Sequence, residues 1–260
     1  MDPGRGLDVQ IARPAGRPLG LAVGRDAPHG PREIHVLTDH PTQADLPPVS
    51  ARRRPDGTLE LCVGLRDDDL EPAWLALAPG GHAVVIGPPR SGRTTALARL
   101  ADAARRPAPG LDLAVVAVTR LGSPWAARAD LVISPDDPDL VAAIRGMERG
   151  GQTILVVVDD ADTTEETHAG LTGLVADRHP DRHLVVSGRA DRMRNRYRHW
   201  ARETAADRTG LLLQPDPDLD GDLLGVALPR RTSVTWVPGR AWLVGDGRLA
   251  IVQVAAPDRD

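Results

Sequence analysis

The fold of this chain is decided by the stretch Gly87-Pro88-Pro89-Arg90-Ser91-Gly92-Arg93-Thr94-Thr95. A short apolar run, residues 82–86, precedes it, and apolar residues at helical spacing follow, so it lies where a buried strand leads into a helix. Its frame is G-x-x-x-x-G-basic-Ser/Thr, whose glycines let the backbone curl with its N–H groups turned inward. With the positive end of the helix, these groups form a seat for phosphate oxygens. The stretch therefore predicts a phosphate-binding loop.

The loop departs from its frame at Arg93, which stands where lysine is expected. Arginine is a longer planar fork that cannot occupy the position of a compact ammonium between two phosphates without pushing the phosphates or folding away. All 32 basic residues of the 260 in the chain are arginine. A general drift of composition from lysine to arginine therefore explains the change, but it is tolerated only where the function no longer needs the lysine ammonium. We expect either nucleotide binding without efficient turnover or an empty pocket. The residues expected to bind the nucleotide are Gly87, Ser91, Gly92, Arg93, Thr94 and Thr95.

A second element is the apolar run 153–158, which ends in Asp159 and Asp160. This has the form of a strand whose first acid holds Mg²⁺ through water, together with the hydroxyl of Thr94. Asp160 stands where many ATPases place a glutamate that orients the attacking water, and its shorter side chain is a second mark against fast hydrolysis. Alternatively, the two acids cap the next loop. Ser187 is interpreted equally well as a γ-phosphate sensor or as an ordinary strand-end serine.

The predicted class is α/β, with a mostly parallel sheet flanked by helices and a C-terminal hairpin, because apolar runs and helical periods alternate from Leu59 onward. We predict one helix after the phosphate loop, ended by Pro107, and a second beginning at Pro138. An arginine-rich amphipathic helix is expected over residues 189–202, either as a solvated face or as a contact for phosphates. The predicted strands cover residues 82–86, 113–118, 154–158, 184–186 and 211–213, and the hairpin covers 240–254.

The first 55 residues are rich in proline, glycine and charge, and we interpret them as a linker that carries the tail of an upstream module. Pro3-Gly4-Arg5 with Val9-Gln10-Ile11 echoes Pro238-Gly239-Arg240 with Val252-Gln253-Val254, although short matches of this kind also arise by coincidence. Residues 56–260 are the predicted nucleotide-binding domain. The chain would then be the last module of a tandem array or a remnant of one.

Composition excludes several classes of protein. The longest apolar runs are far below the roughly 18–20 residues of a membrane span, so no membrane insertion is expected. A single cysteine, Cys62, excludes a disulfide framework, and we expect a cytoplasmic protein in which it belongs to the core. The net charge of −4 provides no global basic field for nucleic acid. His179 and His183 are separated by Pro180 and predict no metal site.

The ordered set of motifs resembles the FtsK/SpoIIIE superfamily, particularly the C-terminal, degenerate ATPase module of multi-domain actinobacterial FtsK-like proteins and type VII secretion ATPases. Besides the phosphate loop and Asp159-Asp160, the resemblance rests on four stretches: Val63-Gly64-Leu65 through Leu70-Glu71-Pro72, Asp207-Arg208-Thr209-Gly210-Leu211-Leu212-Leu213, Leu223-Leu224-Gly225, and Pro238-Gly239-Arg240 with Val252-Gln253-Val254. It covers about residues 59–257.

The resemblance implies a RecA-like P-loop core, ATP and Mg²⁺ as cofactors, and assembly as a homo-oligomer or with upstream ATPase modules. It also implies movement of DNA or of secreted protein substrates. Arg208 falls in a shared signature, and either a role at a neighbour's nucleotide or a structural ion pair fits it. Three functions remain open: a regulatory or docking module that binds ATP with weak or absent hydrolysis, an active DNA translocase, and a structural module without nucleotide.

Overall fold

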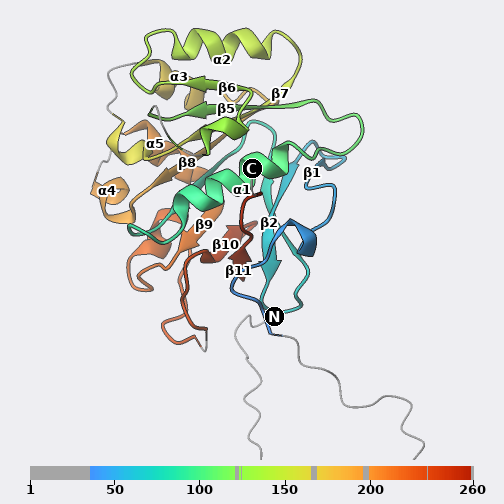
Figure 1. Ribbon diagram of the computed structural model, residues 1–260. Helices are drawn as coiled ribbons and strands as arrows, with labels where there is room; N and C mark the ends of the chain where they lie inside the picture. The colour runs from blue at the N-terminus through green and yellow to red at the C-terminus, as the bar shows by residue number, and fades with distance from the viewer. Residues whose placement is uncertain are drawn as a thin grey trace, which may run out of the picture. The chain divides into compact units, whose positions relative to one another are not determined.

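The structure, a computed structural model, describes residues 36–120, 123, 125–164, 169–195, 199–232 and 234–258. Eleven strands in these ranges form one sheet (Figure 1). They are β1 Ala51–Arg53, β2 Leu59–Arg66, β3 Pro72–Leu77, β4 His82–Ile86, β5 Leu113–Val118, β6 Leu131–Ile133, β7 Thr153–Val158, β8 Arg182–Gly188, β9 Gly210–Leu213, β10 Arg240–Gly245 and β11 Arg248–Val254. Their order is β1-β2-β11-β10-β9-β4-β8-β7-β5-β6, and β3 pairs with β2 beside this path.

The sheet has a parallel and an antiparallel part. Strands β4 to β9 pair in parallel, with β4 between β8 and β9 and with β7 between β5 and β8. The antiparallel part consists of β1, β2, β3, β10 and β11. The predicted α/β class, all five predicted strands and the C-terminal hairpin are confirmed. The pair β2–β3 was not predicted as such.

Helices cover both faces of the parallel strands (Figure 1). They are α1 Arg93–Ala104, α2 Leu140–Glu148, α3 Ala169–Ala176, α4 Ala190–Asn195 and α5 Trp200–Glu203. Alternate strand residues point to opposite faces, so Val85 and Val157 pack with α1 while Val84 and Val156 pack with the other helices. Burial on both faces explains why these strands are continuous apolar runs.

Two helix predictions need correction. The second helix begins at Leu140 rather than at Pro138, because Asp139 is the N-cap. The single arginine-rich helix over residues 189–202 is wrong, because α4 ends at Asn195 and His199 is extended, with φ −88° and ψ 133°. His199 instead caps α5 by accepting a hydrogen bond from the amide of Ala201. Residues 196–198, within the predicted helix, lie outside the described residues.

The chain joins this domain earlier than the expected boundary at residue 55. Val36–Asp260 is one compact unit, in which Leu37 and Leu46 are buried and β1 pairs with the N-terminal half of β2. Strand β1 was not predicted because its residues lie in a stretch rich in arginine and proline. The predicted upstream tail, residues 1–14, lies outside the described residues.

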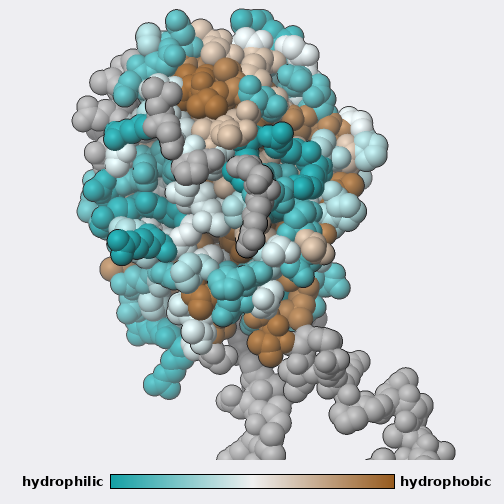
Figure 2. Space-filling model, in the orientation of Figure 1, coloured by the Kyte–Doolittle hydropathy of each residue, from teal (hydrophilic) through white to brown (hydrophobic). Residues whose placement is uncertain are grey.

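One face of the domain is predominantly polar. In Figure 2, hydrophilic residues cover most of the face shown, and apolar residues form small separate groups. In the part of the chain that the structure describes, no helix has the length and apolar character that crossing a bilayer requires.

Candidate functional site

The predicted phosphate loop lies between the carboxyl end of β4 and the start of α1. Gly92 is the N-cap of α1 and adopts φ +103°, a left-handed conformation that favours glycine. Because glycine has no side chain, it supplies no acceptor for the first N–H groups of α1. The positive end of α1 therefore faces the loop without a side-chain cap, as the sequence predicts for a phosphate seat.

Close approach of backbone explains both loop glycines. A Cβ on Gly87 would lie 2.8 Å from the carbonyl oxygen of Leu213, and one on Gly92 would lie 3.0 Å from the amide nitrogen of Gly239. Gly239 itself donates to the carbonyl oxygen of Ser91 at 2.9 Å. The turn before the C-terminal hairpin thus supports the phosphate loop. No such role was predicted for Pro238-Gly239-Arg240 from the sequence.

Ser91 is the polar group of the loop that is most completely enclosed. It is fully buried, and its Oγ has no hydrogen-bond partner among the described residues. Its amide donates to the carbonyl oxygen of Pro88 at 3.3 Å, so this N–H is not turned toward a ligand. A buried hydroxyl without a partner fits a phosphate oxygen as its missing acceptor. Thr94 and Thr95, also expected at the nucleotide, are exposed at the start of α1.

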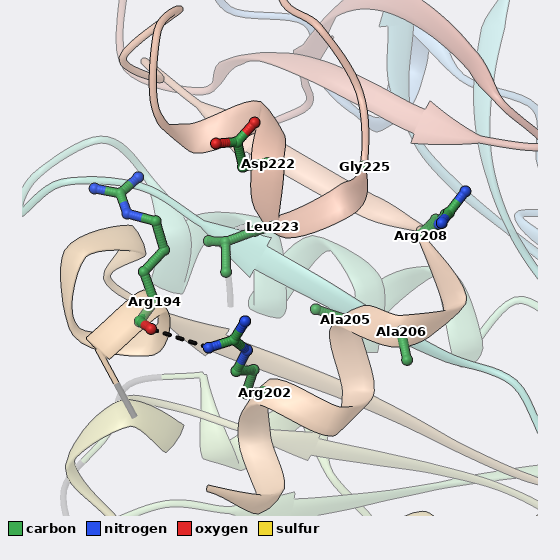
Figure 3. A pocket seen from close by; sticks show the side chains of 8 residues that line it. All are labelled: Arg194, Arg202, Ala205, Ala206, Arg208, Asp222, Leu223 and Gly225. Carbon is green, nitrogen blue, oxygen red and sulfur yellow. Dashed lines mark hydrogen bonds between the residues drawn. The ribbon is translucent and has the colours of Figure 1, made fainter. Parts of the chain in front are cut away.

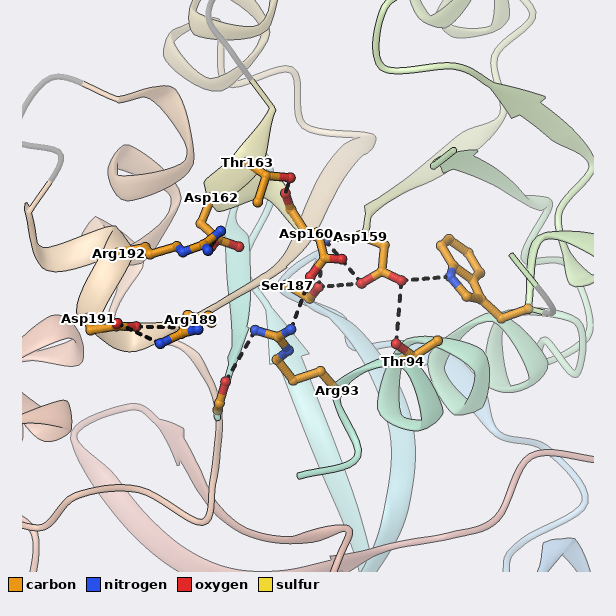
Figure 4. A network of polar contacts seen from close by, with 12 residues as sticks. Arg93, Thr94, Asp159, Asp160, Asp162, Thr163, Ser187, Arg189, Asp191 and Arg192 are labelled. Atoms are coloured by element: carbon orange, nitrogen blue, oxygen red, sulfur yellow. Dashed lines mark hydrogen bonds and ion pairs between the residues drawn. The ribbon is translucent and has the colours of Figure 1, made fainter. Parts of the chain in front are cut away.

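Arg93 turns its guanidinium across the site rather than along the loop (Figure 4). Its Nη1 donates to the carbonyl oxygen of Gly87 at 3.2 Å, and its Nη2 forms an ion pair with Asp160 Oδ1 at 3.0 Å. The Arg93 side chain is 15% exposed, whereas that of Asp160 is 58% exposed. The two residues that depart from the expected motifs are therefore each other's partners.

Asp159 is the most heavily hydrogen-bonded acid of the site. Its Oδ1 accepts from Ser187 Oγ at 2.6 Å and from the amide of Asp160 at 3.0 Å. Its Oδ2 accepts from Trp125 Nε1 at 3.2 Å and, over a longer 3.5 Å, from Thr94 Oγ1. The structure thus brings together the predicted pair Thr94 and Asp159. It also gives Ser187 a partner, because its single hydroxyl hydrogen is directed at Asp159.

Asp160 combines an uncommon backbone conformation with a raised pKa. It adopts φ 49°, a left-handed conformation that is uncommon for aspartate. Partial burial and the nearby charge of Asp159 raise the pKa of Asp160 above its usual 3.8, and Arg93 opposes this shift. The carboxylate expected to orient water is therefore held by a guanidinium.

Sequence reasoning missed two residues of this cluster. Trp125 is buried in the loop after β5, the strand beside β7, and loops at the carboxyl ends of parallel strands are where ligand sites form. That rule could have found it. Asp162, two residues after Asp160, is 1% exposed, and Arg192 lies 3.5 Å from its Oδ2. The sequence feature that could have indicated Asp162 is its position as the third acid after β7.

Arg194 of α4 and Arg202 of α5 line a pocket of about 550 Å³ together with Arg208. Leu223 lies between Arg194 and Arg208 in Figure 3. Arg194 pairs with Asp220 at 2.5 Å, and Arg202 donates to the carbonyl oxygen of Arg194 at 3.0 Å. Arg208 adopts φ 52° and is exposed.

Cys62 is buried in β2, and burial raises the pKa of its thiol to about 11. The thiol is therefore protonated at neutral pH and is not a ready nucleophile. This agrees with the expectation that it belongs to the core.

No family model and no curated protein matches the sequence. Solved structures match by fold. The cytoplasmic domain of the type VII secretion ATPase EccC from Thermomonospora curvata has a TM-score of 0.65 at 17% identity, over 89% of this chain and 30% of that chain. ATPases 2 and 3 of the same organism's EccC, in complex with a signal sequence peptide, give 0.64 at 17% identity, over 89% and 46%. The monomer of TcpA, the pCW3 conjugation coupling protein, with ATPγS gives 0.52 at 13%, over 85% and 71%.

These likenesses concern the fold. The chain has the α/β fold of P-loop ATPase domains, as the resemblance implied, and spans less than half the length of either EccC structure.

Proposed function

We propose that this chain is an ATP-binding module of the FtsK/SpoIIIE type, with weak or absent hydrolysis, that serves a larger translocation machine as a regulatory or docking unit. The observation that carries the proposal is the ion pair between Arg93 and Asp160. It joins the residue that replaces the phosphate-binding lysine to the residue expected to orient water.

Binding is supported by the loop itself. Ser91 Oγ lacks a partner among the described side chains, and α1 begins without a side-chain cap. Both features leave donors at the place where β-phosphate oxygens sit on such loops. These groups do not depend on an ammonium at residue 93.

Weak turnover is supported by the geometry of the acid. A carboxylate that orients water must have a free oxygen directed at that water. Arg93 binds Asp160 Oδ1 and so leaves Oδ2 as the oxygen that can meet water, and the side chain of aspartate is one methylene short of glutamate. Both features reduce the fraction of time in which a water molecule is held for attack.

The partners are proposed from the fold neighbours. One EccC structure holds a signal sequence peptide, and TcpA is a conjugation coupling protein. For this chain we propose a cytoplasmic module that assembles with sister ATPase modules or with copies of itself.

The test measures binding of a fluorescent ATP analogue and phosphate release by the purified chain. We expect saturable binding and a turnover far below one per second, the low end for ordinary enzymes. The double variant Arg93→Lys/Asp160→Glu restores the usual pair and is expected to release phosphate at least tenfold faster. Arg105→Lys, the same chemical change at the exposed end of α1, is the matched control and leaves the rate unchanged.

Two outcomes contradict the proposal. A wild-type turnover near one per second that disappears in Asp159→Ala identifies an active motor. Absence of binding at millimolar nucleotide leaves the structural docking module, which one observation favours: the amide of Ser91 is already bonded to Pro88 within the loop.

A further inference from the structure

Trp125 presents a hydrogen-bond donor to the side of Asp159 where a metal ion is expected. The indole is 1% exposed, and its Nε1 lies 3.2 Å from Asp159 Oδ2. An indole N–H can only donate, so it occupies one of the two acceptor positions of this oxygen.

The Asp159 carboxylate has few acceptor positions left for a further donor. An ionised carboxylate offers about four acceptor positions. Ser187 and the amide of Asp160 reach Oδ1, and this amide also donates to Ser187 Oγ at 3.0 Å. Trp125 and Thr94 reach Oδ2 and take its two acceptor positions. A water of hydrated Mg²⁺ that donates to Oδ2 would have to displace one of them.

Displacing Trp125 is unfavourable because the ring is enclosed. Moving it would leave a buried N–H without an acceptor, which is unfavourable. The alternative is displacing Thr94, whose contact is the longest of the four at 3.5 Å. Displacing Thr94 frees one acceptor position of Asp159 Oδ2. The indole N–H dipole then still points toward the side of Asp159 where the metal ion is expected.

Positive charge is present without a metal. Arg93 lies across the site between Gly87 and Asp160, and the charge of Arg120 also acts on Asp160. Both are cationic side chains. They supply fixed counter-charge for phosphates in place of a divalent cation.

We infer that this site takes the phosphates of a nucleotide without a divalent cation, and that Trp125 is the residue that keeps the metal from Asp159. The inference rests on the proposed function, since it concerns the same site. It replaces the expectation that Thr94 and Asp159 hold Mg²⁺, because Trp125 and Thr94 occupy both acceptor positions of Asp159 Oδ2.

The experiment compares the Kd of a fluorescent ATP analogue in excess Mg²⁺ and in EDTA, by anisotropy. For the wild type we expect the two values to agree within about twofold. Trp125→Phe removes the donor and keeps an aromatic ring, and we expect its Kd to become at least tenfold lower in Mg²⁺ than in EDTA. Trp200→Phe is the matched control, because this indole is also fully buried but its Nε1 has no partner in the described ranges.

The outcomes separate the two proposals. A wild-type Kd at least tenfold lower in Mg²⁺ overturns the inference and leaves nucleotide binding intact, whereas no binding in either buffer overturns both. Circular dichroism checks that Trp125→Phe is folded. If the folded variant has the same Kd in Mg²⁺ and in EDTA, the role of Trp125 is overturned. If that variant does not fold, the wild-type comparison decides metal dependence, and Trp125→His, which keeps a ring nitrogen as donor, must retain the wild-type ratio.

Discussion

The two ends of the parallel strands hold buried polar groups in different ways. At the amino ends, His82 Nε2 contacts the carbonyl oxygen of Val175 at 3.1 Å, and His183 Nδ1 contacts that of Gly81 at 3.2 Å. At the carboxyl ends, Ser91 Oγ has no partner among the described residues, and Asp160 is exposed in a left-handed conformation. The side chains at the amino ends bind main-chain groups of the fold, with His183 Nε2 and Arg182 Nε left without a partner among the described residues, whereas ligands of such sheets bind at the carboxyl ends.

The comparison predicts that changes at the amino end alter stability without altering nucleotide affinity. Arg182 is fully buried and binds Glu148 and the carbonyl oxygen of Leu174. We expect Arg182→Met to lower the free energy of unfolding by about 3–5 kcal/mol, because it leaves Glu148 without its buried partner. Urea unfolding measures this, and the folded variant keeps the wild-type Kd.

Arg178→Met is the control for this change. Arg178 pairs with Asp207 at the same end of the sheet but is 47% exposed, so we expect a loss below about 1 kcal/mol. Equal losses in the two variants would contradict the role given to burial.

The second prediction concerns pH and again addresses the amino end. Burial lowers the pKa of His183 from 6.5 to about 4. Between these values the unfolded chain binds a proton that the folded chain does not, so stability falls as pH falls. From pH 7 to pH 5 we expect a loss of roughly 2 kcal/mol from His183 alone.

Urea unfolding at both pH values tests this, with His183→Asn as the comparison. Asparagine does not titrate, so the variant should lose about 2 kcal/mol less than the wild type over the same interval. The same loss in both proteins would show that His183 does not titrate in this way.

The smallest effect is expected at the carboxyl end. Ser91→Ala removes a buried hydroxyl that has no partner in the described chain, so the free energy of unfolding should stay level or rise by up to about 1 kcal/mol. The Kd of the ATP analogue should rise about fivefold, because one donor to phosphate is lost, a change of about 1 kcal/mol.

Ser50→Ala is the control for Ser91. Ser50 is equally buried, but its Oγ donates to the carbonyl oxygen of Pro47 at 3.0 Å. We expect it to lose about 1 kcal/mol of stability and to keep its affinity. A stability loss in Ser91→Ala with unchanged Kd would reverse the comparison between the two ends.

Strongly local patterns were predictable. The buried strands β4 and β5 were predicted with their observed bounds, because each is an apolar run between turn residues. The start of α2 and the break between α4 and α5 were not, because the caps Asp139 and His199 compete with equally plausible neighbours. Strand β1 was missed because an arginine-rich edge strand has no apolar alternation.

By itself the sequence determined the α/β class, the loop at Gly87–Thr95 and the two acids after β7, because each depends on spacing within a few residues. Only the tertiary structure decided what these groups do to each other. Arg93 meets Asp160 across 67 residues and Trp125 meets Asp159 across 34, because β4, β8, β7 and β5 lie side by side with their carboxyl ends together. Hydrogen bonds between distant segments depend on strand order, which residue spacing does not encode.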